Sequence, residues 1–144
     1  MAVVCFGGSR HERIEIDVRR YEREPIGEYY DDNWLRVRIT VAAGAFEGSF
    51  DAAFLTSELV AFREQLSTLH STLRGSAELR TLEEQLSLDC VGNGLGSVEL
   101  RGVAFDRPGV GNRLAFKLAL DQTQVGAALA QLEAVVSEFP VRDV

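Results

Sequence analysis

Hydrophobic and polar residues alternate most regularly between Asn33 and Leu55. Apolar residues take every second position before Gly44 and again after it, which is the pattern of two half-buried β-strands. Because so short a connection joins them, the two strands should pair antiparallel. The residues predicted to face inward are Leu35, Val37, Ile39, Val41, Phe46, Phe50, Ala52 and Phe54.

Two further segments repeat apolar residues at intervals of three and four, as an amphipathic helix does. The first begins after Thr56 or Ser57, either of which can cap a helix, and Gly75 is placed to end it in the left-handed conformation. The second begins after Asp121 or Thr123. Their predicted buried stripes are Leu59, Phe62, Leu66, Leu69 and Leu73 in the first helix, and Val125, Ala128, Leu129, Leu132, Val135, Val136 and Phe139 in the second.

Shorter alternating runs predict five more strands, at 14–18, 77–79, 86–90, 98–105 and 114–120. The glycine-rich stretch Gly92–Gly96 is predicted to be a hairpin turn. A strand follows it, whereas a phosphate-binding loop needs a helix at that place. Near Gly102 the alternation shifts by one residue, and a β-bulge is the simplest account of the shift.

The predicted order of elements is βββαββββα, with short connections that favour antiparallel pairing. Each helix needs an apolar surface to cover, so we expect a two-layer α+β fold in which a mainly antiparallel sheet of about seven strands carries both helices on one face. Leu66 and Leu132 should then lie on the same side of the sheet. The 144 residues are expected to form a single domain. Residues 1–12 are expected to be poorly ordered, because Gly7-Gly8-Ser9 gives little reason for order.

Composition narrows the function classes. Hydrophobic residues make up 46% and charged residues 26%, as in ordinary soluble domains, and no apolar run approaches the ~20 residues of a membrane span. The net charge of −7 argues against nucleic acids and anionic membranes and suits a basic partner. Cys5 and Cys90 do not make a disulfide framework, so a reduced, cytoplasmic protein with a buried Cys90 is expected.

Residues that could perform catalysis are sparse. The sequence lacks the nucleophile-elbow, zinc-protease and paired-cysteine motifs. His11 and His70 are too few for a metal site built from imidazoles. Glu83 and Glu84 are adjacent, and neighbours in a strand point to opposite faces, so they are poor partners for acid–base chemistry. We therefore predict a protein without catalytic residues, cofactor or metal.

The segment from Tyr21 to Trp34 is the most unusual in composition. It holds all three tyrosines, the only tryptophan and −4 of the net charge of −7. Aromatic anchors inside a rim of one charge sign are typical of protein-recognition surfaces. The alternatives are a solvated loop whose aromatic rings pack back onto the sheet, and a metal site at the two aspartates, whose spacing matches no calcium loop. The predicted partner-binding residues are Tyr21, Glu28, Tyr29, Tyr30, Asp31, Asp32 and Trp34.

A set of short motifs spreads over about three quarters of the chain. They are Asn33-Trp34-Leu35, Gly44-x-Phe46-x-Gly48, Glu58-Leu59-x-x-Phe62, Leu73-x-Gly75-x-Ala77, Gly94-x-Gly96, Asn112-Arg113-Leu114-x-Phe116, Asp121-Gln122-Thr123 and Phe139-Pro140-Val141. Through these motifs the chain between about Asn33 and Val141 resembles the WapI-like bacterial immunity proteins. The region 1–20 lies outside the resemblance.

The resemblance implies a non-enzymatic protein that binds and neutralises the toxic C-terminal domain of a contact-dependent toxin. It assigns no individual functional residue. A basic toxin domain would suit the acidic charge of this chain. The alternative is a small-ligand-binding or self-associating domain, with a homodimer formed through the outer alanines of the last helix, Ala127, Ala130 and Ala134.

Overall fold

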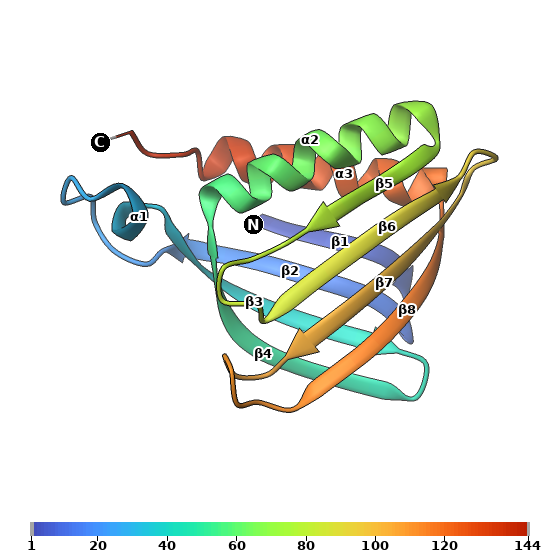
Figure 1. Ribbon diagram of the computed structural model, residues 1–144, viewed down its shortest axis with the longest axis horizontal. Helices are drawn as coiled ribbons and strands as arrows, with labels where there is room; N and C mark the ends of the chain where they lie inside the picture. Colours follow the sequence, from blue (N-terminus) through green and yellow to red (C-terminus); the bar gives the residue numbers. More distant parts are fainter. Residues whose placement is uncertain (1, 144) are drawn as a thin grey trace.

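The computed structural model describes residues 2–143 and contains two antiparallel four-stranded sheets that face each other, with two long helices packed side by side at one edge (Figure 1). The first sheet has the order β1-β2-β3-β4, with bounds Ala2–Ser9, Glu12–Tyr21, Trp34–Ala43 and Phe46–Leu55. The second has the order β5-β6-β7-β8, with bounds Arg74–Leu79, Leu86–Asn93, Ser97–Phe105 and Arg113–Asp121. The helices of the described chain are α1 (Tyr29–Asp32), α2 (Thr56–Thr72) and α3 (Gln122–Glu138).

The predicted α+β class is confirmed, but the prediction of one sheet of about seven strands is wrong. β4 and β5 belong to different sheets, and α2 connects them. Alternation shows which side of a strand is buried, but not which sheet the strand joins. The inward residues of both sheets and both long helices form one continuous core, in which Leu66 and Leu132 are both buried.

The two halves of the chain repeat the same plan. α2 follows the first sheet and packs against β5, whereas α3 follows the second sheet and packs against β1. The buried residues of the two helices also share one spacing, namely Leu59, Phe62, Leu66 and Leu69 in α2 against Val125, Ala128, Leu132 and Val135 in α3. Each helix therefore covers the first strand of the sheet that it does not follow.

The N-terminal region differs from the prediction. Ala2–Ser9 form β1, which pairs with β2 and buries Val4 and Phe6, so the expectation of poor order over 1–12 is wrong for the described residues, and Met1 lies outside them. Gly7 makes the β1–β2 hairpin possible, because it has a φ of 84° and a Cβ there would collide with the backbone carbonyl of Glu12. Glycine in this segment marks a close approach of two strands.

The helix ends agree with the prediction only in part. α2 is capped by Leu55, whose backbone N–H donates to the Glu58 carboxylate at 2.7 Å, and not by either of the two residues that follow Leu55. At the other end Leu73, and not Gly75, ends the helix in the left-handed conformation, with a φ of 60°. Gly75 also has a positive φ, of 87°, but it lies within β5. Asp121 caps α3, as one of the two predicted alternatives.

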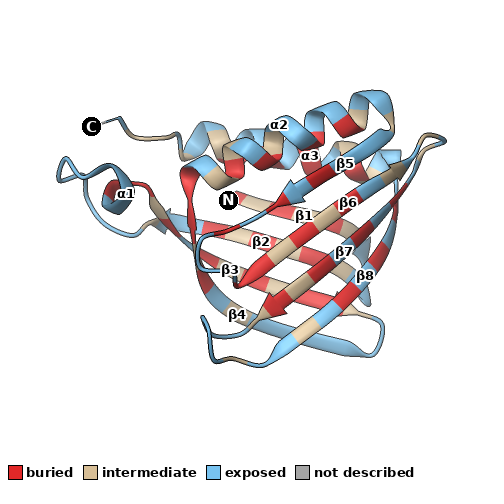
Figure 2. Ribbon diagram, in the orientation of Figure 1, coloured by how far each residue is buried: buried red, intermediate tan, exposed pale blue. Residues whose placement is uncertain are grey.

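The strand alternation is largely as predicted, and Figure 2 shows buried and exposed residues alternating along the second sheet. The predicted hairpin at Gly92–Gly96 is confirmed, since it joins β6 to β7. The predicted bulge at Gly102 is wrong, because β7 pairs in continuous register with both neighbours. Phe46 is also wrongly placed by the alternation, since it is 65% exposed.

Candidate partner-binding surface

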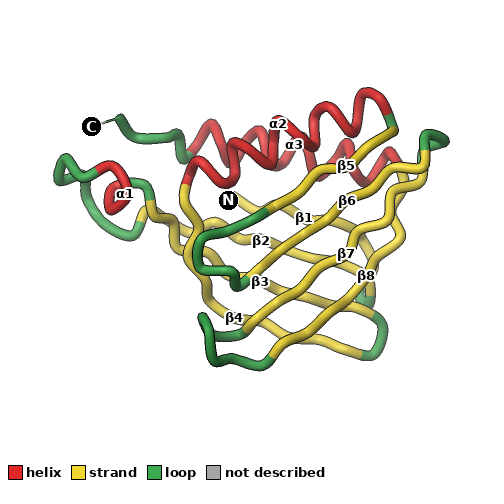
Figure 3. The backbone as a smooth tube through the Cα atoms, viewed as in Figure 1, coloured by secondary structure: helices red, strands yellow, loops and turns green. Residues whose placement is uncertain are grey.

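The predicted segment leaves the first sheet at the end of β2 and returns to it at the start of β3. Figures 1 and 3 show it as a loop with the single turn of α1, standing away from the sheets at one end of the molecule. Sequence periodicity did not predict α1, because one turn is too short to show a helical period. We call residues 22–33 the tyrosine loop.

Asp32 holds the tyrosine loop together from inside. It is only 3% exposed, and its carboxylate accepts hydrogen bonds from the backbone N–H groups of Ile26 (2.8 Å), Gly27 (2.8 Å) and Glu28 (3.2 Å). Desolvation acts to raise the pKa of this carboxyl, but the three N–H donors and the nearby Arg23 outweigh it and hold the pKa below its ordinary value. Asp32 thus supports the loop and offers no exposed charge to a partner, which corrects its predicted place in the contact surface.

Asn33 connects the loop to two other parts of the chain. Its side-chain N–H₂ donates to the carbonyls of Tyr29 (2.7 Å) and Arg142 (2.9 Å). Its side-chain oxygen accepts from the Thr56 hydroxyl (2.8 Å) and the Arg142 backbone N–H (2.7 Å). The buried Asn33 amide therefore joins α1, the start of α2 and the C-terminal segment. Reasoning from the sequence missed this role, although Asn33 begins the first motif of the family resemblance.

The C-terminal segment after α3 lies against the base of the loop. The Arg142 guanidinium sits 3.5 Å from the centre of the Tyr21 ring and donates to the carbonyls of Arg23 (3.0 Å) and Asp32 (3.3 Å). The Tyr21 hydroxyl donates to the Pro140 carbonyl. Burial raises the pKa of Tyr21, against the opposing effect of Arg142. Tyr21 is therefore a half-buried support and not an exposed anchor.

Four of the predicted residues remain on the outside of the loop. Tyr29 is 39% and Tyr30 64% exposed, and their rings meet edge to face with centroids 5.4 Å apart. Glu28 and Asp31 are exposed beside them. Ile26, which sequence reasoning did not include, adds an apolar side chain that is 62% exposed. We call these five residues the tyrosine surface.

Trp34 belongs neither to the supports of the loop nor to the tyrosine surface. It is half-buried at the start of β3 and lines a hollow of about 360 Å³ together with Glu22, Arg36, Asp51 and Pro108. The structure therefore divides the predicted set in three: the exposed Glu28, Tyr29, Tyr30 and Asp31, the supporting Tyr21 and Asp32, and Trp34 in a separate hollow.

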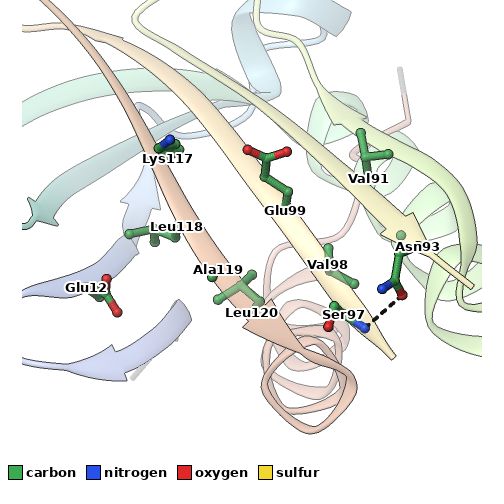
Figure 4. A pocket seen from close by; sticks show the side chains of 11 residues that line it. Glu12, Val91, Asn93, Ser97, Val98, Glu99, Lys117, Leu118, Ala119 and Leu120 are labelled. Atoms are coloured by element: carbon green, nitrogen blue, oxygen red, sulfur yellow. Dashed lines mark hydrogen bonds between the residues drawn. The ribbon is translucent and has the colours of Figure 1, made fainter. Parts of the chain in front are cut away.

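A larger hollow of about 620 Å³ lies on the second sheet, as Figure 4 shows. Its charged lining residues are Glu12, Glu99 and Lys117, and the Ser97 backbone N–H donates to the side-chain oxygen of Asn93 at 3.1 Å. Its lining contains no histidine or cysteine.

Metal ligands, reactive thiols and membrane-spanning helices are the other features of the described chain that could indicate a function. Within residues 2–143, no group of three His, Cys, Asp or Glu side chains is placed to hold a metal ion. Cys90 is buried, as predicted. Burial raises the pKa of its thiol to about 12, with Asp89 adding to the effect, and this disfavours the reactive thiolate. None of the described helices is long and apolar enough to cross a lipid bilayer.

One known protein family matches nearly the whole length of the chain. The model of the immunity protein WapI-like family matches residues 5–140. The match begins within β1 and so extends well before Asn33, where the sequence motifs begin. No match to the chain was found among curated proteins. The chain therefore belongs to the WapI-like immunity protein family.

Proposed function

We propose that this protein is a non-enzymatic immunity protein that binds and neutralises a bacterial toxin domain, and that the tyrosine surface is part of its contact with the toxin. Membership of the family supports the first part of the proposal. The observation that carries the second is the exposed Tyr29–Tyr30 pair on a loop whose backbone is fixed from beneath. Tyrosines are among the residues that contribute most to binding energy at protein interfaces.

Fixing the loop before binding favours affinity. A flexible loop loses conformational entropy when a partner orders it, and this loss subtracts from the binding free energy. Here Asp32 accepts three hydrogen bonds from the loop backbone, and Asn33 and Arg142 attach the loop to the rest of the fold. The loop that carries the two exposed tyrosines would therefore lose little further conformational entropy when a partner binds.

The charge of the chain agrees with a basic partner. Toxin domains that attack nucleic acids must approach phosphate groups and are usually basic, so an acidic protein with a net charge of −7 gains association rate and specificity. Glu28 and Asp31 place acidic groups next to the two tyrosines. The proposal includes a cytoplasmic location, which suits the two free cysteines, Cys5 and Cys90.

The test needs a cognate toxin domain, which the immunity proposal expects to be encoded next to the gene of this protein. Co-expression should protect cells from the toxin, and the purified proteins should bind. Tyr30→Ala should cost about 1–2 kcal/mol of binding free energy, roughly a 5- to 30-fold loss of affinity, with folding unchanged. Leu95→Ala is the matched control, because Leu95 is 86% exposed on the β6–β7 hairpin at the opposite end of the molecule (Figure 1). Absence of protection by the wild type rejects the immunity function, and unchanged affinity of the Tyr30 variant rejects the surface.

Self-association is the second candidate function. It is favoured by the outer face of α3, where Ala127, Ala130 and Ala134 are all exposed and present little side chain to hinder a close helix contact. Light scattering after size exclusion decides this case. A monomer at the concentrations of the binding experiment contradicts self-association and leaves the immunity proposal unaffected.

A further inference from the structure

Two of the four outer strand edges in this fold are covered by helices. α3 lies along β1, where the Gln131 side-chain oxygen accepts a hydrogen bond from the Cys5 backbone N–H at 2.7 Å. α2 lies along β5, where Gln65 accepts in the same way from the Glu78 N–H at 2.9 Å. In both cases a helix glutamine satisfies a backbone group that the sheet leaves unpaired.

The other two edges, β4 and β8, have no helix along them, and they differ in their side chains. β8 carries Arg113 and Lys117 on its outer side, and charged residues of this kind hinder pairing with another chain. β4 contains no lysine, arginine or proline. The first four residues of β4, from Phe46 to Ser49, are all exposed, and Gly48 places no side chain over the backbone. The charged side chains of β4, Glu47 and Asp51, are both acidic, so they hinder pairing with an acidic strand and leave this edge open to a basic one.

The register identifies the backbone groups that are free. β3 pairs with β4 through Val41↔Gly48 and Ile39↔Phe50, and the Asp51 carbonyl accepts a hydrogen bond from the Gln85 side chain at 3.2 Å on the side away from β3. Since backbone groups alternate in direction along a strand, Glu47 and Ser49 point outward with Asp51. Their N–H and C=O groups have no hydrogen-bond partner within residues 2–143.

The outward-facing groups of β4 border a groove between β4 and β8. A groove of about 220 Å³ runs along the edge, with Gly48, Ser49 and Phe50 on the β4 side and Arg113 and Leu114 of β8 opposite. Phe46, at the start of the strand, is 65% exposed and provides an apolar contact. A free backbone ladder beside a groove is the arrangement that domains use when they bind a peptide by adding a strand to a sheet.

We propose that β4 between Phe46 and Asp51 is a docking edge, on which a basic extended segment of the toxin domain pairs as a fifth strand of the first sheet; this inference rests on the proposed immunity function. The acidic charge at this edge favours a basic segment as the partner. Glu47 has an exposed side chain with no salt-bridge partner in the described chain, so it calls for a lysine or arginine opposite. A second copy of this chain is disfavoured, because antiparallel self-pairing about Ser49 sets Glu47 against Asp51 of the copy.

The test removes one outward donor. Ser49→Pro deletes the free N–H, and proline is tolerated at edge-strand positions whose N–H faces solvent. Ser49→Ala is the matched control, since it loses the hydroxyl contact with Thr40 (3.1 Å) but keeps the N–H. The proline variant should bind the cognate toxin domain about tenfold more weakly, whereas the alanine variant should bind like the wild type.

Hydrogen exchange on the wild type gives an independent measurement in case the proline variant does not fold. The amides of Glu47 and Ser49 should exchange fast in the free protein and at least about tenfold more slowly in the toxin complex. A toxin that binds without slowing these amides overturns the docking edge and leaves the immunity function standing. A wild type that does not bind the toxin overturns both, so the two failures are distinguishable.

Discussion

At the scale of single residues, glycine and small side chains caused the clearest errors of sequence interpretation. The shift of alternation at Gly102 has the same sequence signature as a bulge, since Val103 and Phe105 are apolar and follow out of phase. In the structure the inward positions are Gly102 and Ala104, and the Phe116 ring of the neighbouring strand fills the space above Gly102. Local alternation does not show which side chain of a neighbouring strand packs over a glycine, so this part of the core could not be predicted from the sequence.

The same contact gives a prediction. Gly102→Ala puts a Cβ into the Phe116 ring, and relief requires movement of the ring or of β7. Overpacking of this kind costs about 1–3 kcal/mol of unfolding free energy, which denaturant titration can measure. Gly48→Ala is the control, because a Cβ there meets open space, and its stability should stay within about 0.5 kcal/mol of the wild type. A neutral Gly102→Ala would show that the ring is not confined.

At the scale of elements, periodicity located both long helices and every strand of the described chain except β1, but it did not show which elements pack together. The stripe from Leu59 to Leu69 shows that α2 has one buried face, and that face is equally suited to either sheet. Its packing on β5, and that of α3 on β1, depends on the arrangement of the two halves, which no local pattern records. The candidate surface was likewise predictable only where the evidence is local. Its composition identified Tyr29 and Tyr30. The contacts between Asn33 and Arg142 could not be predicted, because they join residues more than a hundred positions apart.

The C-terminal segment is the element whose effect on the site is most open to test. Arg142→Ala removes the stacking on Tyr21 and the side-chain hydrogen bonds to the Arg23 and Asp32 carbonyls. The amides of Ile26 to Glu28 should then exchange faster, by roughly five- to tenfold, while the amides of β6 and β7 stay unchanged, because the loop opens without unfolding the sheets. Asp143→Ala, an exposed neighbour in the same segment, should leave the loop amides as they are. Equal exchange in the two variants would mean that the loop is held without Arg142.

At the scale of the whole molecule, the net charge of −7 and the position of the acidic groups make separate contributions to partner binding. Net charge attracts a basic toxin from a distance, and any acidic residue contributes to that attraction. Acidic groups beside the tyrosines should also orient the encounter, because they lie where contact is made. Two double variants that remove the same charge from different places can separate these contributions.

Glu28→Gln with Asp31→Asn removes two exposed acids from the tyrosine surface, and Glu12→Gln with Glu99→Gln removes two exposed acids from the hollow on the second sheet. The first pair should lower the association rate with the toxin domain by roughly two- to fivefold at low salt, more than the second pair does. The dissociation rates should change little. At about 0.5 M salt the difference should disappear, because screening confines exposed charges to short range. Stopped-flow kinetics at two ionic strengths measures this. Equal effects of the two pairs would mean that only the net charge acts, and the toxin would then have to dock away from the tyrosine surface.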